Sequence, residues 1–72
     1  MLLLADPDAG FREEAADDLR EAGYDVTAVD SATAARDELA SAEPIDCLVT
    51  EQDLPDGTGL ELVREARERS PD

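Results

Sequence analysis

The sequence predicts an α/β fold, in which helices cover the faces of a parallel sheet. Short apolar runs alternate with amphipathic segments, and this strand-helix pattern occurs three times along 72 residues. Alternation at this spacing indicates parallel strands joined by right-handed crossovers. Residues 1–72 are therefore expected to form one small domain. Its stability is marginal, because a fold of this size buries only roughly 60% of the surface that its unfolded chain exposes.

The first unit joins a buried strand at about residues 2–5 to a helix at about residues 8–22. The strand is apolar throughout. The helix is indicated by apolar side chains spaced i, i+4, i+8 and i+11: Phe11, Ala15, Leu19 and Ala22. Asp8 is expected to cap the amino end of this helix, and Gly23 to follow its carboxyl end.

The second unit joins a strand at about residues 24–29 to a helix at about residues 32–42. Alternate side chains of the strand share one side: Tyr24, Val26 and Ala28. Ser31 is expected to cap the helix. The apolar positions of the helix are Ala32, Ala35, Leu39 and Ala42.

The third unit joins a buried strand at about residues 45–50 to a helix at about residues 59–69. Between them the segment LPDGTG turns the chain. Thr58 and Glu61 have the spacing of a capping box at the start of the helix. The apolar positions of this helix are Leu60, Val63 and Ala66.

The composition is strongly acidic, with 20 Asp and Glu residues, 6 basic residues that are all arginine, and a formal net charge of −14. Such a surface repels nucleic acids and anionic membranes, so neither is an expected partner. At molar salt the screening length falls to about 3 Å. We therefore expect a halophilic protein that folds in a salt-rich cytoplasm, and full folding in dilute buffer would count against this hypothesis. The apolar content of 42% and its periodicity argue against disorder.

The sequence also bears on cellular location. The apolar stretch in the amino-terminal segment MLLLADPD is too short for a signal peptide or a membrane span. The single cysteine, Cys47, cannot form an internal disulfide and lies in an apolar run, which predicts a buried thiol in a reducing compartment. We therefore expect a soluble cytoplasmic protein.

Two carboxylates from distant parts of the chain are expected to meet at one edge of the sheet. In open parallel sheets, sites form at the carboxyl ends of the strands, where the winding reverses; for the strand order 2-1-3 this point lies between the first and third strands. Asp6 and Glu51 follow these two strands. A pair of carboxylates suits Mg²⁺, which takes one or two of them together with waters.

These residues also carry a family resemblance. The matching features are the strand ending at LLLAD, the helix ending with LREAGYDV, the segment VDSATAARDEL and, most specifically, DCLVTEQDLPDGTGLELVRE. The layout resembles the receiver domain of two-component response regulators. The resemblance implies a flavodoxin-like, three-layer αβα fold, of which only the first three strand-helix units are present.

The resemblance also implies a site. In that family, two adjacent acids after the first strand bind Mg²⁺, and an aspartate after the third strand accepts a phosphoryl group from a histidine kinase. Asp6 matches the first acid, but Pro7 occupies the place of the second. Glu51, four residues before Pro55, occupies the phosphoacceptor position. The backbone carbonyl of Asp53 matches a metal-ligand position, and its side chain is a candidate substitute acceptor.

The departures from the family pattern predict a signalling module rather than an enzyme. The lysine that reads out phosphorylation in the family is missing, since the chain has no lysine. Asp6, Glu51 and Asp53 would then form a weak remnant of a magnesium site. The expected function is an atypical receiver that acts as a protein-interaction module with a histidine kinase or another signalling protein. The plain alternatives are that Asp6 caps a turn and that Glu51 and Asp53 are solvated acids.

Two further interpretations remain open. Asp6-x-Asp8 after an apolar strand resembles the first motif of haloacid-dehalogenase-type phosphatases, although Ala9–Gly10 departs from that motif. A sheet of three strands would also leave the third strand with an open edge and exposed apolar surface. Such an edge invites pairing with another chain, so homodimerisation or docking onto a partner is expected.

Overall fold

The computed structural model describes residues 1–41 and 44–69. Its centre is a parallel sheet of three strands in the order β2-β1-β3, formed by β1 (Leu2–Ala5), β2 (Val26–Val29) and β3 (Cys47–Thr50). Leu2 is paired with Val26 and Cys47, and Ala5 with Val29 and Thr50. The three strands therefore end at the same edge, and the predicted fold class and strand order are confirmed.

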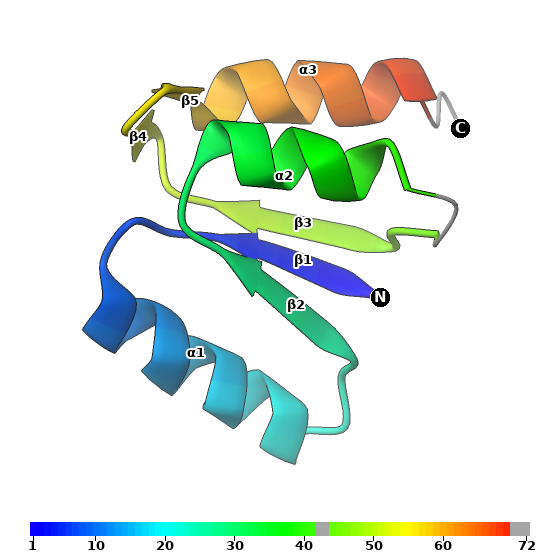
Figure 1. The fold of residues 1–72 in the computed structure, drawn as a ribbon. Helices are drawn as coiled ribbons and strands as arrows, with labels where there is room; N and C mark the ends of the chain where they lie inside the picture. Colours follow the sequence, from blue (N-terminus) through cyan, green and yellow to red (C-terminus); the bar gives the residue numbers. More distant parts are fainter. Residues whose placement is uncertain (42–43, 70–72) are drawn as a thin grey trace.

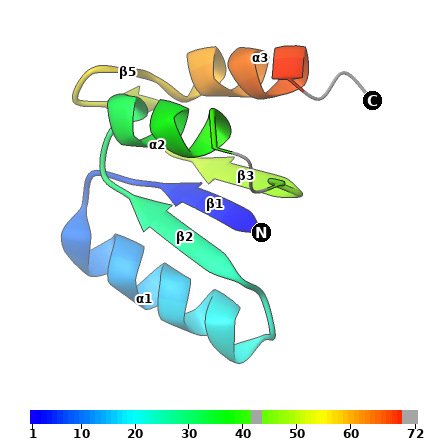
Figure 2. The same ribbon diagram turned by 45° about the vertical axis from the view of Figure 1, so that its right-hand side comes forward.

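Helices cover both faces of this sheet. The helix α1 (Ala9–Glu21) lies on one face, whereas α2 (Ala32–Leu39) and α3 (Gly59–Arg69) lie together on the other (Figures 1 and 2). Alternate side chains of β1 lie on opposite faces of the sheet, because successive side chains of a strand point to opposite sides. No helix within residues 1–41 and 44–69 is long and apolar enough to cross a membrane.

The core accordingly has two parts, one on each side of β1. Leu2 and Leu4 pack toward α1, in a cluster with Ala16 and Val26. The larger cluster on the other side contains Leu3, Ala5, Ala32, Ala35, Leu54 and Leu62. Each fully buried leucine stabilises the fold by roughly 1.5–3 kcal/mol relative to an exposed one.

The helix caps follow the sequence. Asp8 accepts a hydrogen bond from the Phe11 N–H at the start of α1, and Ser31 accepts one from the Ala34 N–H at the start of α2. Gly23, directly after α1, has a φ of 102°, which favours glycine. These three predictions are confirmed.

The strand β2 begins at Val26, two residues later than the sequence pattern indicates. The N–H groups of Gly23 and Tyr24 still bind carbonyls of the last turn of α1, at Arg20 and Leu19. The chain reverses direction there and pairs with β1 only from the Asp25 carbonyl onward, which accepts from the Leu2 N–H. Tyr24 is therefore exposed and not part of the strand face.

The expected burial of Phe11 is wrong, because 56% of this residue is exposed. Ala15 and Leu19 pack against the cluster beneath α1 as expected, with Ala16 fully covered beside them. Phe11 lies in the first turn of the helix, at the edge of the sheet, and lines a pocket there.

The third unit also differs from expectation in its exposed side chains. β3 is not a buried strand: Cys47 and Val49 are exposed, whereas Leu48 packs against the larger cluster. The prediction of a buried Cys47 thiol is therefore wrong, because α1 packs on β1 and β2 and leaves that side of β3 uncovered by the described residues. β3 begins at Cys47, two residues later than expected.

The helix α3 has the expected bounds, but its buried stripe is shifted. Gly59 and Leu62 are buried, Val63 and Ala66 are half-buried, and Leu60 is 50% exposed. The spacing i, i+3, i+4, i+7 from Gly59 describes the stripe, and Leu60 lies beside it. Of the expected capping box, the Thr58 hydroxyl accepts from the Glu61 N–H, whereas the Glu61 carboxylate binds Arg36.

A small antiparallel hairpin precedes α3. It consists of β4 (Asp53–Leu54) and β5 (Gly57–Thr58). Its strands have two residues each, too few for a periodic pattern in the sequence. The hairpin brings Asp56 to the amino end of α2. The helix α2 ends at Leu39, and the predicted apolar position Ala42 lies outside the described residues.

Asp56 caps α2 from a distant part of the chain. Its carboxylate accepts hydrogen bonds from the Ala32 N–H (2.7 Å), the Thr33 N–H (2.9 Å) and the Thr33 hydroxyl. Arg36 of α2 forms ion pairs with Glu61 and Glu65 of α3, at 3.1 and 3.0 Å. These contacts tie the hairpin and α3 to α2.

The cap predicts a pH-dependent stability. The hydroxyl and the N–H of Thr33 and the N–H of Ala32 lower the pKa of Asp56 below its usual value of 3.8. Stability from a carboxyl with a lowered pKa is present above its unfolded value and is lost as the pH falls through the folded one. Asp56→Asn should therefore destabilise the protein at pH 6, and the difference from the wild type should shrink well below pH 3.8, as measured by thermal unfolding.

Asp37→Asn is the matched control for this variant, because it removes one negative charge from an exposed position of α2, the helix that Asp56 caps. An equal change in melting temperature in both variants would show that net charge, and not the cap, determines the effect.

Candidate functional site

The residues that follow β1 and β3 meet at the carboxyl edge of the sheet. The Glu51 N–H donates to the Ala5 carbonyl at 2.9 Å, which continues the pairing of the two strands. A pocket of about 370 Å³ opens at this edge. It is lined by Asp6, Pro7, Asp8, Phe11, Glu51 and Asp53. The fold therefore brings together the three residues that the sequence singles out as site candidates, Asp6, Glu51 and Asp53.

Asp6 is buried at this edge of the sheet and is held there by hydrogen bonds. Only 4% of the residue is exposed. Its Oδ1 accepts from the Asp8 N–H at 2.9 Å, and its N–H donates to the Val29 carbonyl at 3.0 Å. Its own carbonyl accepts from Nη1 of Arg12 at 2.9 Å. Asp6 thus braces the turn through Pro7 into α1, as a short polar side chain does in an Asx-turn.

Glu51 is exposed and differently placed. Its carboxylate has no hydrogen bond or ion pair with any residue of 1–41 and 44–69. Its backbone, in contrast, is hydrogen-bonded at both polar groups: the Glu51 N–H donates to the Ala5 carbonyl at 2.9 Å, and the Glu51 carbonyl accepts from the Thr50 hydroxyl at 2.9 Å. The next residue, Gln52, accepts from the Gly59 N–H with its carbonyl and from the Leu60 N–H with its Oε1, at 3.0 and 3.1 Å. The structure therefore presents a free carboxylate on a rigid backbone.

Gly59 is required for this arrangement. A Cβ atom at position 59 would lie 2.5 Å from the carbonyl oxygen of Glu51 and 2.9 Å from Cγ2 of Thr50. Only a residue without a side chain allows α3 to start this close to the end of β3.

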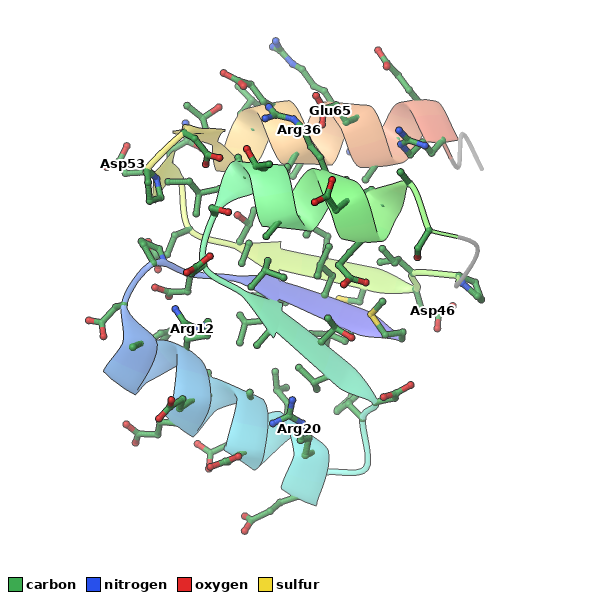
Figure 3. All side chains as sticks on the ribbon, viewed as in Figure 1. Arg12, Arg20, Arg36, Asp46, Asp53 and Glu65 are labelled. Atoms are coloured by element: carbon green, nitrogen blue, oxygen red, sulfur yellow. The ribbon has the colours of Figure 1, made fainter. Side chains whose placement is uncertain are left out.

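Asp53 lies at the beginning of the hairpin, and Arg12 lies on α1 on the other side of the sheet edge (Figure 3). The Asp53 side chain is exposed and makes no hydrogen bond or ion pair with the described residues. The Asp53 carboxylate therefore adds negative charge to the pocket, and none of the described residues binds it.

The donor atoms in the pocket are carboxylate oxygens, which suit Mg²⁺ in kind. Their arrangement does not fit a preformed metal site. Within residues 1–41 and 44–69, no three Asp, Glu, His or Cys side chains are close enough to hold a metal ion together. Pro7 offers no ligand, and the Asp8 carboxylate already caps α1.

Three residues of this region escape prediction from the sequence. Phe11 forms a wall of the pocket, Arg12 binds the Asp6 carbonyl, and Asp56 anchors the hairpin that follows Glu51. The only signal for Phe11 and Arg12 is their position in the first helical turn after a strand end. Asp56 lies in a Pro-Asp-Gly turn, and nothing local indicates that it reaches α2.

Two comparisons with known proteins identify the family. The sequence profile of a family described as "Response regulator receiver domain" matches residues 2–72. The response regulator receiver protein CpdR of Brucella abortus (strain 2308) is 38% identical over 71 residues, which are 99% of this chain and 58% of that protein. The chain thus spans little more than half the length of this relative.

Proposed function

The chain belongs to the response regulator receiver family, and we propose that it is an atypical receiver, which acts as a cytoplasmic protein-interaction module of two-component signalling. Its partners are histidine kinases or other signalling proteins, the class with which receiver domains interact. One observation carries the proposal. The residue at the acceptor position is Glu51, whose free carboxylate stands at the edge of the sheet next to the buried Asp6.

A glutamate at this position argues against phosphoryl transfer. Its side chain is longer than that of aspartate by one C–C bond, ~1.5 Å, so its oxygens stand further from the strand end. In-line phosphoryl transfer depends on the position of the nucleophile and on a metal that neutralises charge. A carboxylate that extends further can imitate part of the charge and reach of a phosphorylated aspartate. The signal is then fixed, and not switched.

The first test is phosphorylation by a small phosphoryl donor, acetyl phosphate, in the presence of Mg²⁺. We expect no phosphorylated wild-type protein in an intact-mass measurement. Glu51→Asp restores the shorter nucleophile but not a second metal ligand at Pro7, so we expect at most slow, partial phosphorylation of this variant.

Rapid, Mg²⁺-dependent phosphorylation of Glu51→Asp would contradict the inference that the metal site is also impaired. Phosphorylation of the wild type that disappears in Asp53→Asn would identify Asp53 as a substitute acceptor. That result would overturn the proposal of a receiver with a fixed signal.

The second test concerns Mg²⁺ itself. We propose that Asp6, Glu51 and Asp53 form a weak remnant of a site, in which one or two of these carboxylates bind the ion at a time, because Mg²⁺ needs only one or two carboxylates beside its waters. In an amide-resolved NMR titration in molar KCl, we expect shifts confined to these three residues and their neighbours, with a millimolar dissociation constant. Glu51→Gln should reduce the shifts, whereas Glu65→Gln, on α3, should not. Micromolar binding would contradict a site that is not preformed.

The phosphatase alternative gains no support. Its motif would need Asp8 as a free acid, and the structure shows this carboxylate bound to the Phe11 N–H at the start of α1. The family profile that matches the chain is that of receivers.

A further inference from the structure

The hairpin of β4 and β5 connects the acidic pocket with α2. Asp53, which lines the pocket, is paired with Thr58, and Leu54 is paired with Gly57. Each strand has only two residues, and an isolated two-stranded hairpin is at best marginally stable in water. The conformation of this hairpin therefore depends on its contacts with the rest of the chain.

Two of these contacts hold the base and the inner side of the hairpin. The Gly59 N–H donates to the Gln52 carbonyl at 3.0 Å, directly outside the two strands. On the inner side, Leu54 is buried in the larger cluster of the core. Neither contact reaches the turn of the hairpin, which consists of Pro55 and Asp56 and is exposed.

The first turn of α2 holds the turn of the hairpin. The Asp56 carboxylate accepts hydrogen bonds there from the Ala32 N–H, the Thr33 N–H and the Thr33 hydroxyl. Gly57 lies against the same turn of α2, because a Cβ atom at position 57 would be only 3.0 Å from Cβ of Ala32. The hairpin is thus fixed to α2 by one polar contact and one close packing contact, next to each other.

The position of Asp53 depends on this hairpin. Its side chain makes no hydrogen bond or ion pair with any residue of 1–41 and 44–69. Its backbone belongs to β4. The carboxylate can therefore stay at the pocket only as long as the hairpin keeps its place beside α2.

We propose that Asp56 is a positioning residue of the acidic pocket. Its carboxylate holds the hairpin on α2 and thereby keeps Asp53 at the carboxyl edge of the sheet. When this contact is lost, the hairpin opens while the parallel sheet stays folded, because segments with few buried contacts open before the core does. The inference rests on the proposed function only in treating the pocket as the functional site.

The test is amide hydrogen exchange of the isotope-labelled full chain, measured by NMR for the protected amides of residues 53–59 and of β1 in the same sample. In Asp56→Ala, exchange in the hairpin should become about fivefold faster relative to β1, an effect of the size that the loss of an N-cap side chain typically has. The amide signals of Glu51 and Asp53 should shift. The nuclear Overhauser contact between Gly57 and the Ala32 methyl group should weaken.

Ser31→Ala is the matched control. Ser31 caps the same helix, but its hydroxyl binds the Ala34 N–H of α2 itself and not the hairpin. This variant should leave the ratio of exchange rates between hairpin and β1 unchanged, even where it lowers the melting temperature. Asp56→Asn keeps one acceptor oxygen on the side chain, so its hairpin should exchange at a rate between those of the wild type and Asp56→Ala.

A milder variant completes the test. Thr33→Val removes the hydroxyl that donates to Asp56 and keeps both N–H donors of α2. Exchange in the hairpin should become faster than in the wild type, by less than in Asp56→Ala. Circular dichroism verifies that each variant is folded, and Thr33→Val and Asp56→Asn decide the question where Asp56→Ala is unfolded.

Two results would overturn the inference. Equal acceleration in the hairpin and in β1 would show that Asp56 contributes only to global stability. Unchanged exchange in the hairpin, with the contact between Gly57 and Ala32 preserved, would show that the burial of Leu54 is sufficient to hold it. Ready phosphorylation of the wild type by acetyl phosphate would contradict the proposed fixed signal alone, because the exchange measurement needs no phosphoryl donor.

Discussion

Leu62→Ala is expected to unfold a large fraction of the protein. Leu62 is fully buried in the larger cluster, which also contains Leu3 of the central strand and Leu54 of the hairpin. Replacing a buried leucine by alanine typically costs 2–5 kcal/mol, from lost burial and the cavity that remains. A core of this size rarely provides more than about 3–5 kcal/mol. The measurement is urea unfolding followed by far-ultraviolet circular dichroism.

Leu60→Ala is the control on the same helix. It removes the same atoms from a side chain that is half exposed, so the free energy of unfolding should change by less than about 1 kcal/mol. Similar unfolding midpoints for the two variants would contradict the placement of the buried stripe of α3.

Gly59→Ala is expected to disturb both stability and the candidate site. The new methyl group would overlap the carbonyl oxygen of Glu51, at 2.5 Å, and this atom belongs to the backbone and cannot rotate away. Overpacking of this kind typically costs 1–3 kcal/mol. We expect a lower unfolding midpoint together with shifted amide signals at Glu51 and Gln52.

Gly10→Ala provides the contrast. Gly10 lies in α1, and the nearest atom to an added Cβ there is Oδ1 of Asp8 at 3.5 Å, an ordinary contact. Alanine is favoured over glycine within a helix by up to about 1 kcal/mol, so this variant should be slightly stabilised. A Gly59→Ala protein as stable as Gly10→Ala would show that the start of α3 can move away from β3 at little cost.

The order of elements could be predicted because it depends on local signals. Apolar runs and periodicity identify the three strands of the parallel sheet and the three helices, and the caps at Asp8 and Ser31 fix two helix starts. The predictions that were wrong concern the ends of the helices and strands and the burial of side chains at the edge of the sheet. Whether Phe11 or Cys47 is buried depends on which other elements extend over it, and periodicity within one segment does not contain that information.

The candidate site, too, could be predicted only in part from the sequence. The meeting of Asp6 and Glu51 follows from strand order, because parallel strands end at a common edge. The different surroundings of the two carboxylates do not follow from strand order. Asp6 is buried by a turn that its own side chain stabilises, whereas Glu51 is exposed. The contacts of Asp56 show most clearly what a local sequence pattern does not indicate, since its partners on α2 lie 24 and 23 residues earlier in the chain.

The division of the core by β1 also bears on how the chain folds during synthesis. The residues packed beneath α1 all belong to the first 29 positions, from Leu2 to Val26 and Ala28. They can associate as soon as β2 has left the ribosome. The opposite face of β1 is completed only when Leu62 has joined Ala32 and Ala35 in the cluster around Leu3 and Ala5. Until α3 has been synthesised, this face is therefore only partly covered, and it is the apolar surface through which a nascent chain of this protein is most vulnerable to aggregation.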